Sequence, residues 1–294
     1  MVKIATFIII LFVGCLYVSG QKIPEVKFNH LYFVLKPNDL KALQESLFIK
    51  DSFAACETRT TRADSQATWT GTYLYGSSNY LEFFEAPADD PNLGFLGIGF
   101  SVDKIGDLVI LKEHLDNSSN TGIQGRERTI DSVNIPWFDA LSVLDTTMLD
   151  SAFMSQLHFW FWIMEYKKEY FDFHGYTIEN DLLTRENYLK KYKTQRENKI
   201  VERFSGVVMK LNPGEKEYIT RYFSHIDYKK INDHEYRSPD NFRFIIKDRE
   251  PGDSNSVELV QFETSKNYEK NKVVQISENI YITFEADKGQ IHFK

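Results

Sequence analysis

The chain has 294 residues, a formal net charge of −7 and an aromatic content of 15%. A mildly acidic chain without a basic block is a poor partner for nucleic acid, so we expect no nucleic-acid binding. A chain of this length buries roughly 70–75% of its unfolded surface, so its hydrophobic core can stabilise the fold without disulfides.

The first twenty residues have the layout of a secretory signal peptide. Lys3 supplies the positive charge, residues 4–13 form a short apolar run, and residues 18–20 are a small-residue cleavage site before Gln21. We therefore expect a secreted or periplasmic protein that does not contact the membrane after cleavage, with Cys56 as its single cysteine. An uncleaved anchor and a lipid anchor on Cys15 are the alternatives, and the apolar residues after Cys15 disfavour the second.

The first predicted unit has the order β-α-β-β-β. Residues 28–35 are rich in Phe, Leu, Tyr and Val, which is typical of a strand. Pro37 suits the first turn of a helix, and a leucine stripe at helical spacing follows, ending at Leu47. Three stretches with strand composition come next, "ACETRTTRA", "ATWTGTYLYG" and "NYLEFFEAP".

A similar pattern begins again at residue 95. A strand over 95–102 leads into a helix of about 104–115, and the strand-like stretches "ERTIDSVNI", "FDALSVL" and "LHFWFWIMEY" follow. Residues 175–203 are polar and rich in Lys, Arg and Glu, which predicts a surface helix or linker.

A third start at residue 204 repeats the first unit with an offset of 176 residues. Pairs that share this offset are Phe28 with Phe204, Leu35 with Leu211, Pro37 with Pro213 and Glu82 with Glu258, whereas His30 maps to Gly206. The offset predicts a duplicated unit. The residues after Glu258 are interpreted as a hairpin or as the start of an incomplete fourth unit.

Four motifs resemble the vicinal oxygen chelate superfamily and its glyoxalase-like domains. They are "FNHLYFVL", "GTYLYGSSNYLEFFEAP", "LGIGFSVDKIGDL" and "LHFWFWIMEY". The resemblance implies an α+β fold of repeated βαβββ units whose mixed sheets curl around a cleft. The expected division is a signal peptide (1–20), a glyoxalase-like domain of two units (21–174), a linker helix (175–203) and a degenerate C-terminal unit (204–294).

In this superfamily two units hold a metal with residues from their first and last strands. The resemblance implies His30 and Glu82 as ligands from the first unit and Glu165 as a ligand from the second, where Gly97 stands in place of a first-strand ligand. Such donors suit Zn, Fe, Mn, Co or Ni, and three protein ligands leave one position open. The alternative for His30 is a hydrogen-bonded core histidine, and for Glu165 a solvated or Lys-paired side chain.

Candidate substrate-binding residues are Trp160, Trp162 and Asn79. The two tryptophans share one strand face and are interpreted as pocket walls or as core, and Asn79 as a turn-former or a pocket hydrogen bond. We expect a metal-dependent lyase, isomerase or dioxygenase acting on a small oxygen-rich molecule. The alternatives are a metal-free small-molecule binding protein and a structural or interaction module. No catalytic residue and no oligomeric state follow from the sequence.

Overall fold

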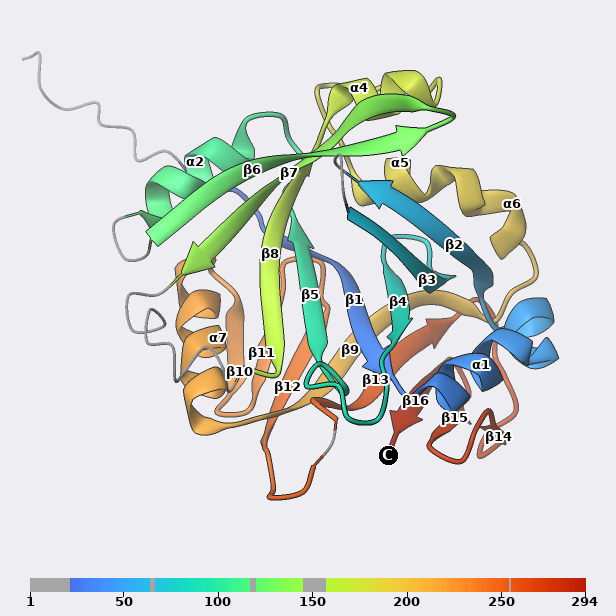
Figure 1. Cartoon of the computed structure of the whole chain (residues 1–294). Coiled ribbons are helices and arrows are strands. Elements are labelled where there is room, and N and C mark those ends of the chain that lie inside the picture. Colours follow the sequence, from blue (N-terminus) through green and yellow to red (C-terminus); the bar gives the residue numbers. More distant parts are fainter. Residues whose placement is uncertain (1–21, 64–66, 117–119, 145–156, 254) are drawn as a thin grey trace, which may run out of the picture.

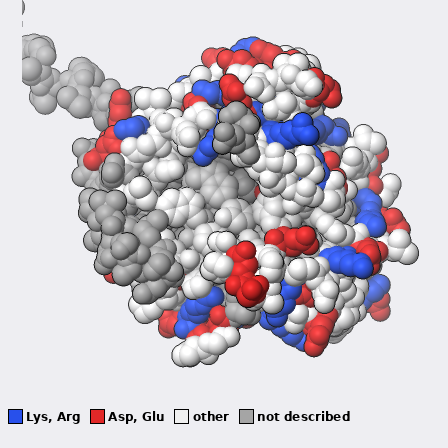
Figure 2. Space-filling model, in the orientation of Figure 1, with Lys and Arg blue, Asp and Glu red and all other residues white. Residues whose placement is uncertain are grey.

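The computed structural model describes residues 22–63, 67–116, 120–144, 157–253 and 255–294. The predicted signal peptide, with Cys15, lies outside the described residues. No helix within the described ranges has the length and hydropathy needed to cross a membrane. Lys and Arg side chains are interspersed with Asp and Glu side chains over the face drawn in Figure 2, so the charges on this face are mixed in sign.

The N-terminal strands form a closed barrel in the order β1-β4-β3-β2-β6-β7-β8-β5 (Figure 1). β1 runs parallel to β4 and antiparallel to β5, so the prediction of an α+β fold with curled mixed sheets is confirmed. The barrel strands are β1 (Lys27–Leu35), β2 (Ala55–Ala63), β3 (Ala67–Tyr75), β4 (Tyr80–Glu85), β5 (Leu96–Ser101), β6 (Asn120–Ile130), β7 (Val133–Leu144) and β8 (Phe159–Tyr166).

The C-terminal strands form a second sheet in the order β10-β11-β12-β9-β13-β16-β15-β14. It lies below the barrel in Figure 1, and its strands after β9 are orange to red. These strands are β9 (Val201–Leu211), β10 (Lys229–Asn232), β11 (Glu235–Arg237), β12 (Arg243–Asp248), β13 (Val257–Thr264), β14 (Val273–Gln275), β15 (Ile280–Glu285) and β16 (Lys288–Phe293).

The helices are short and lie around the two sheets. They are α1 (Pro37–Glu45), the π-helical turn η1 (Phe48–Phe53), α2 (Asp107–Leu115), α4 (Lys168–Phe173), α5 (Arg185–Leu189), the 3-10 turn η3 (Lys190–Tyr192), α6 (Lys193–Arg196) and α7 (Pro213–His225). Pro37 opens α1 as predicted, but α1 ends at Glu45, so Leu47 lies beyond the helix and is 71% exposed.

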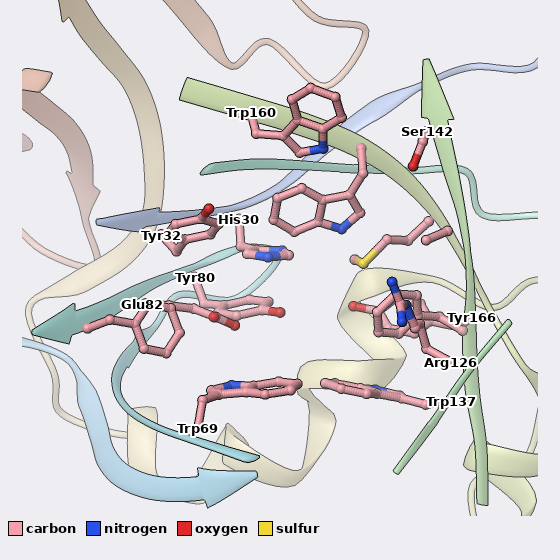
Figure 3. A pocket seen from close by; sticks show the side chains of 15 residues that line it. His30, Tyr32, Trp69, Tyr80, Glu82, Arg126, Trp137, Ser142, Trp160 and Tyr166 are labelled. Atoms are coloured by element: carbon pink, nitrogen blue, oxygen red, sulfur yellow. The ribbon is translucent and has the colours of Figure 1, made fainter. Parts of the chain in front are cut away.

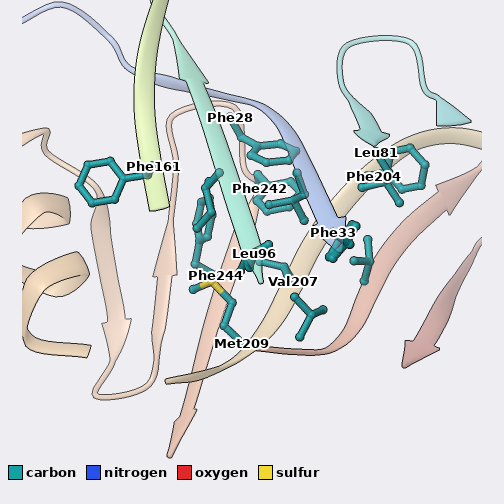
Figure 4. Packing of buried hydrophobic residues seen from close by; sticks show 14 of the residues in the cluster. Phe28, Phe33, Leu81, Leu96, Phe161, Phe204, Val207, Met209, Phe242 and Phe244 are labelled. Atoms are coloured by element: carbon teal, nitrogen blue, oxygen red, sulfur yellow. The ribbon is translucent and has the colours of Figure 1, made fainter. Parts of the chain in front are cut away.

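The main core lies between the outer face of the barrel and one face of the C-terminal sheet (Figure 4). The rings of Phe28 and Phe242 stack with centroids 3.6 Å apart. Asn79 adds polar contacts, because its side-chain amide donates to the carbonyl of Phe204 at 2.8 Å and its oxygen accepts from the amide of Phe204 at 2.9 Å. The structure therefore places Asn79 between the barrel and β9, outside the barrel cavity.

The 176-residue offset holds for β1 with β9 and for the prolines that begin α1 and α7, but the pairing of Glu82 with Glu258 is wrong. Glu82 lies opposite Tyr32 on the strand parallel to β1. The strand parallel to β9 is β12, where Ile245 lies opposite Val208. Glu258 belongs to β13, which runs antiparallel to β9.

The predicted linker does not form one long helix. Residues 185–196 form α5, η3 and α6, and Tyr188 and Tyr192 are buried against aromatic side chains of the barrel. Tyr192 stacks on Tyr75 with ring centroids 3.6 Å apart, and Tyr188 stacks on Tyr166 at 4.7 Å. The segment therefore covers one end of the barrel.

Candidate functional site

The interior of the barrel contains a cavity of about 480 Å³ that is open to solvent on one side. All four tryptophans of the chain line it, and Figure 3 shows Trp160 on one side of the cavity with Trp69 and Trp137 on the other. The lining side chains are His30, Tyr32, Trp69, Tyr80, Glu82, Phe84, Arg126, Trp137, Phe138, Ala140, Ser142, Trp160, Trp162, Met164 and Tyr166. Cavities of this size and aromatic character are typical of sites for small organic molecules.

Strand alternation explains the walls of the cavity. On β8 the alternate residues Trp160, Trp162, Met164 and Tyr166 face the interior, while Phe159, Phe161 and Ile163 belong to the core outside the barrel. On β4 the inward residues are Tyr80, Glu82 and Phe84. The inward side chains of β4 and β8 thus give the cavity mainly aromatic walls with few polar groups.

Glu82 is the acidic group of this cavity. Burial among aromatic side chains raises the pKa of the Glu82 carboxyl to about 7. The positive charge of Arg59, a hydrogen bond with Tyr80 and the charge of Arg128 oppose this rise without cancelling it. Arg59 is itself held by Glu57 and lies 4.2 Å above the ring of Tyr73. Glu82 therefore changes its protonation state near neutral pH.

His30 is a neutral hydrogen-bonding group of the same cavity. Burial lowers the pKa of the His30 ring to about 3. Its Nδ1 lies 2.9 Å from Oδ1 of Asn29, whose amide group donates to the hydroxyl of Tyr166 at 3.1 Å. Because an amide oxygen only accepts, Nδ1 carries the proton and Nε2 is the acceptor of the ring. The ring stacks on Tyr80 with centroids 4.6 Å apart (Figure 3).

Two glycines of β5 make room for these rings. Gly99 lies opposite His30 and Gly97 opposite Tyr32 in the antiparallel pair. A Cβ atom on Gly99 would lie 2.3 Å from the His30 ring, and one on Gly97 would lie 1.8 Å from the Tyr32 ring. A side chain that could bind a metal from β5 would thus displace the rings that now form this wall.

The predicted three-ligand metal set is not brought together. Among the residues that the structure describes, no group of three or more His, Cys, Asp or Glu side chains is arranged to hold a metal. Glu165 faces away from the cavity, because its two carboxylate oxygens accept hydrogen bonds from the amides of Gly106 at 3.0 Å and Leu108 at 2.8 Å. These amides begin α2, so Glu165 caps a helix. The residues present do not fit a catalytic metal with three protein ligands.

A family model described as "Family of unknown function (DUF5829)" matches residues 28–293. The chain belongs to this family. No curated protein matches it.

Three solved structures whose titles name dioxygenases show a distant similarity to this chain. The 2,3-dioxygenase LapB from Pseudomonas sp. KL28 is 11% identical with a TM-score of 0.42, and the match covers 81% of this chain and 74% of that one. A xylose isomerase-like TIM barrel/4-hydroxyphenylpyruvate dioxygenase fusion protein is 9% identical with a TM-score of 0.41, covering 79% of this chain and 34% of that one. A putative dioxygenase from Bacillus subtilis subsp. subtilis str. 168 is 9% identical with a TM-score of 0.28, and the match covers 89% of this chain and 81% of that one. Similarities at this level carry no conclusion about the reaction.

The structure adds cavity residues that sequence reasoning missed. Trp69 and Trp137 come from β3 and β7, and Arg126 comes from β6. A signal for Trp69 was present, because it alternates with the inward-facing Tyr73 on one strand. The positions of Arg126 and Trp137 depend on a bulge in the β6–β7 pair at Arg126 and Glu127, which no local pattern reveals.

Proposed function

We propose that this protein binds a flat aromatic small molecule in the barrel cavity, without a metal ion. The single observation that supports the proposal is the concentration of all four tryptophans around one cavity of about 480 Å³. Aromatic rings stack favourably on planar ligands and bury much apolar surface at low entropic cost.

The polar groups of the cavity favour a ligand with a hydroxyl group. Glu82 and Nε2 of His30 accept hydrogen bonds. A phenol hydroxyl donates a hydrogen bond, so it suits these acceptors.

The second candidate function is a proton-transfer reaction, an isomerisation or elimination with Glu82 as the base. A carboxyl group whose pKa lies near 7 is suited to exchange protons at neutral pH. His30 remains neutral there and can hold a hydroxyl or carbonyl-bearing ligand in place through hydrogen bonding. A metal-dependent form of this reaction would need a third ligand besides His30 and Glu82. β5 cannot supply it at this wall, because Gly97 and Gly99 have no side chains.

Tryptophan fluorescence tests the proposal, because every tryptophan lies at the cavity. We expect 2-naphthol to quench the emission saturably and to stabilise the protein against heat, with naphthalene as the matched compound lacking the hydroxyl. The variant Glu82→Gln should weaken 2-naphthol and leave naphthalene unchanged, whereas Glu85→Gln, exposed on the same strand, should change neither. Absence of saturable quenching by both compounds would refute the binding proposal. Stoichiometric metal in the purified protein, lost in His30→Ala, would refute its metal-free part.

We further propose that the protein is exported after removal of residues 1–20, and that residues 21–174, 175–203 and 204–294 are its glyoxalase-like, linking and degenerate repeat units. Mass spectrometry of protein collected outside the cytoplasm tests the first statement, because an N-terminus at Gln21 is expected.

A further inference from the structure

A second cavity, of about 380 Å³, lies on the C-terminal sheet. Its lining belongs to adjacent strands from β11 to β15 and to the loop before β12. The lining residues are Arg203, Ser205, Arg237, Asn241, Arg243, Gln261, Phe262, Glu263, Glu285, Lys288, Gly289 and Gln290. Unlike the barrel cavity it is mainly polar, and three arginines contribute to it.

A row of side chains in strand register crosses this cavity. Arg237 lies opposite Arg243, Arg243 opposite Gly206, Gly206 opposite Gln261, and Gln261 opposite Gln290. A Cβ atom on Gly206 would lie 2.6 Å from Oε1 of Gln261 and 3.1 Å from Cβ of Arg243. The glycine in the middle of the row therefore lets the two flanking side chains converge over it.

Glu235 holds the arginines of this row, and Gln261 makes a longer contact from the other side, accepting from Nη1 of Arg243 at 3.4 Å. Glu235 accepts from Nε of Arg243 at 2.9 Å and from Nη2 at 3.2 Å, and more weakly from Arg237 at 3.4 Å. Two like charges directly opposite each other destabilise a sheet unless an anion lies between them. The Nε of Arg237 has no hydrogen-bond partner in the part of the chain that the structure describes. The carboxylate of Glu235 thus accepts hydrogen bonds from two guanidinium groups.

The neighbouring row is already paired. Arg203 donates to both carboxylate oxygens of Glu263, at 2.8 and 2.6 Å, and Lys288 lies 3.6 Å from Glu285. These carboxylates line the cavity as acceptors and repel a multiply charged anion. The cavity therefore combines arginine donors and amide groups in one row with carboxylate acceptors in the next.

We propose that this cavity binds a small hydroxylated carboxylate, of the sugar-acid class. Guanidinium N–H groups pair well with a single carboxylate group. Glu235 already holds Nε and Nη2 of Arg243, so the donor that Arg243 turns to a ligand is Nη1, which makes only a long contact of 3.4 Å with Gln261. Gln261, Gln290 and the acidic row can exchange hydrogen bonds with several hydroxyl groups. A phosphate, with its higher charge, is disfavoured by the two glutamates of the paired row.

Isothermal titration of the full chain with D-glucuronate tests this inference, with D-glucose and inorganic phosphate as comparison probes. We expect glucuronate to bind, and glucose and phosphate to bind at least about tenfold more weakly. Arg243→Gln should weaken glucuronate by about 10-fold or more. Lys247→Gln, on the same strand but outside the cavity, and Glu82→Gln, in the barrel, should leave glucuronate binding unchanged.

Each contrary result overturns the inference. These results are no glucuronate binding, equal or tighter binding of phosphate, unchanged binding in Arg243→Gln, or loss of binding in Glu82→Gln. If circular dichroism shows that Arg243→Gln does not fold, Gln290→Ala on β16 replaces it. This variant should bind glucuronate several-fold more weakly, and unchanged binding would refute the proposal.

Discussion

The substitution Glu82→Gln should make the protein more stable at pH 8 than the wild type, although it removes a charged group from the barrel. The pKa of the Glu82 carboxyl is about 7 in the folded chain against 4.5 for an ordinary glutamate. Each unit of pKa difference between the folded and unfolded chain corresponds to about 1.36 kcal/mol, so this difference lowers the free energy of unfolding by about 3 kcal/mol once Glu82 is ionised. Because the cavity admits solvent, we expect about 1 to 2 kcal/mol.

The direction follows from proton binding. Between pH 4.5 and about 7 the unfolded chain has lost the proton of Glu82 while the folded chain keeps it, so this group's contribution to stability falls as the pH rises through that window. Above the window the loss is complete. A glutamine keeps the shape and one acceptor oxygen but cannot ionise, so the variant lacks this loss.

Chemical unfolding at pH 5, 6, 7 and 8, followed by circular dichroism, measures the effect. The free energy of unfolding of Glu82→Gln minus that of the wild type should increase with pH up to about 7 and then stay constant. The difference between two proteins isolates Glu82, because His30 also titrates abnormally and affects both alike. Glu85→Gln, exposed on the same strand, should show no such slope. A flat difference for Glu82→Gln would show that burial does not raise this pKa.

Two further substitutions test the walls of the barrel. Gly99→Ala should lower the free energy of unfolding by about 1 to 3 kcal/mol, because the new methyl group displaces the His30 ring. Gly122→Ala, with open space around the new methyl group, should leave the free energy of unfolding nearly unchanged in the same chemical unfolding experiment. Glu165→Gln should lower the stability in thermal unfolding by about 1 to 2 kcal/mol, because an amide nitrogen replaces one of the two carboxylate oxygens that cap α2. The same variant should bind 2-naphthol as the wild type does. Loss of binding would show that Glu165 faces the cavity after all.

Local sequence pattern predicted the strands and helix of the first unit, because their side-chain periods are set by burial on one face. The same parity argument places Trp160 and Trp162 on one face of β8 and Glu165 on the other, so the three residues were never compatible with one cavity. The metal prediction for Glu165 came from family resemblance alone. The structure corrects it through the hydrogen bonds of Glu165 to the start of α2.

Long-range register is the part that the sequence did not reveal. A constant offset of 176 residues aligned Glu82 with Glu258, but connections of different length put Glu258 on β13, the wrong neighbour of β9. Likewise, the convergence of Trp69 and Trp137 requires a closed barrel. Among the residues that the structure describes, one bridge, from Ala63 to Arg128, joins β2 to β6 at its seam. Interactions between distant strands decide such pairings, and no local window contains them.

The corrected register shows why the two cavities differ in chemistry. In the barrel His30 lies on the middle strand between Tyr80 on the parallel neighbour and Gly99 on the antiparallel neighbour. The corresponding three positions of the C-terminal sheet are Gly206, Arg243 and Gln261.

The glycine of this row therefore lies on different strands in the two sheets, on the antiparallel neighbour in the barrel and on the middle strand in the C-terminal sheet. In the barrel it is Gly99, so the imidazole of His30 covers it and the wall is neutral and aromatic. In the C-terminal sheet it is Gly206, so the side chains of Arg243 and Gln261 cover it and the wall is charged and polar. This ladder position thus gives the two walls their different character, which matches the aromatic ligand proposed for one cavity and the anionic ligand proposed for the other. It follows that a side chain at Gly206 should disturb glucuronate binding alone, and one at Gly99 should disturb 2-naphthol binding alone.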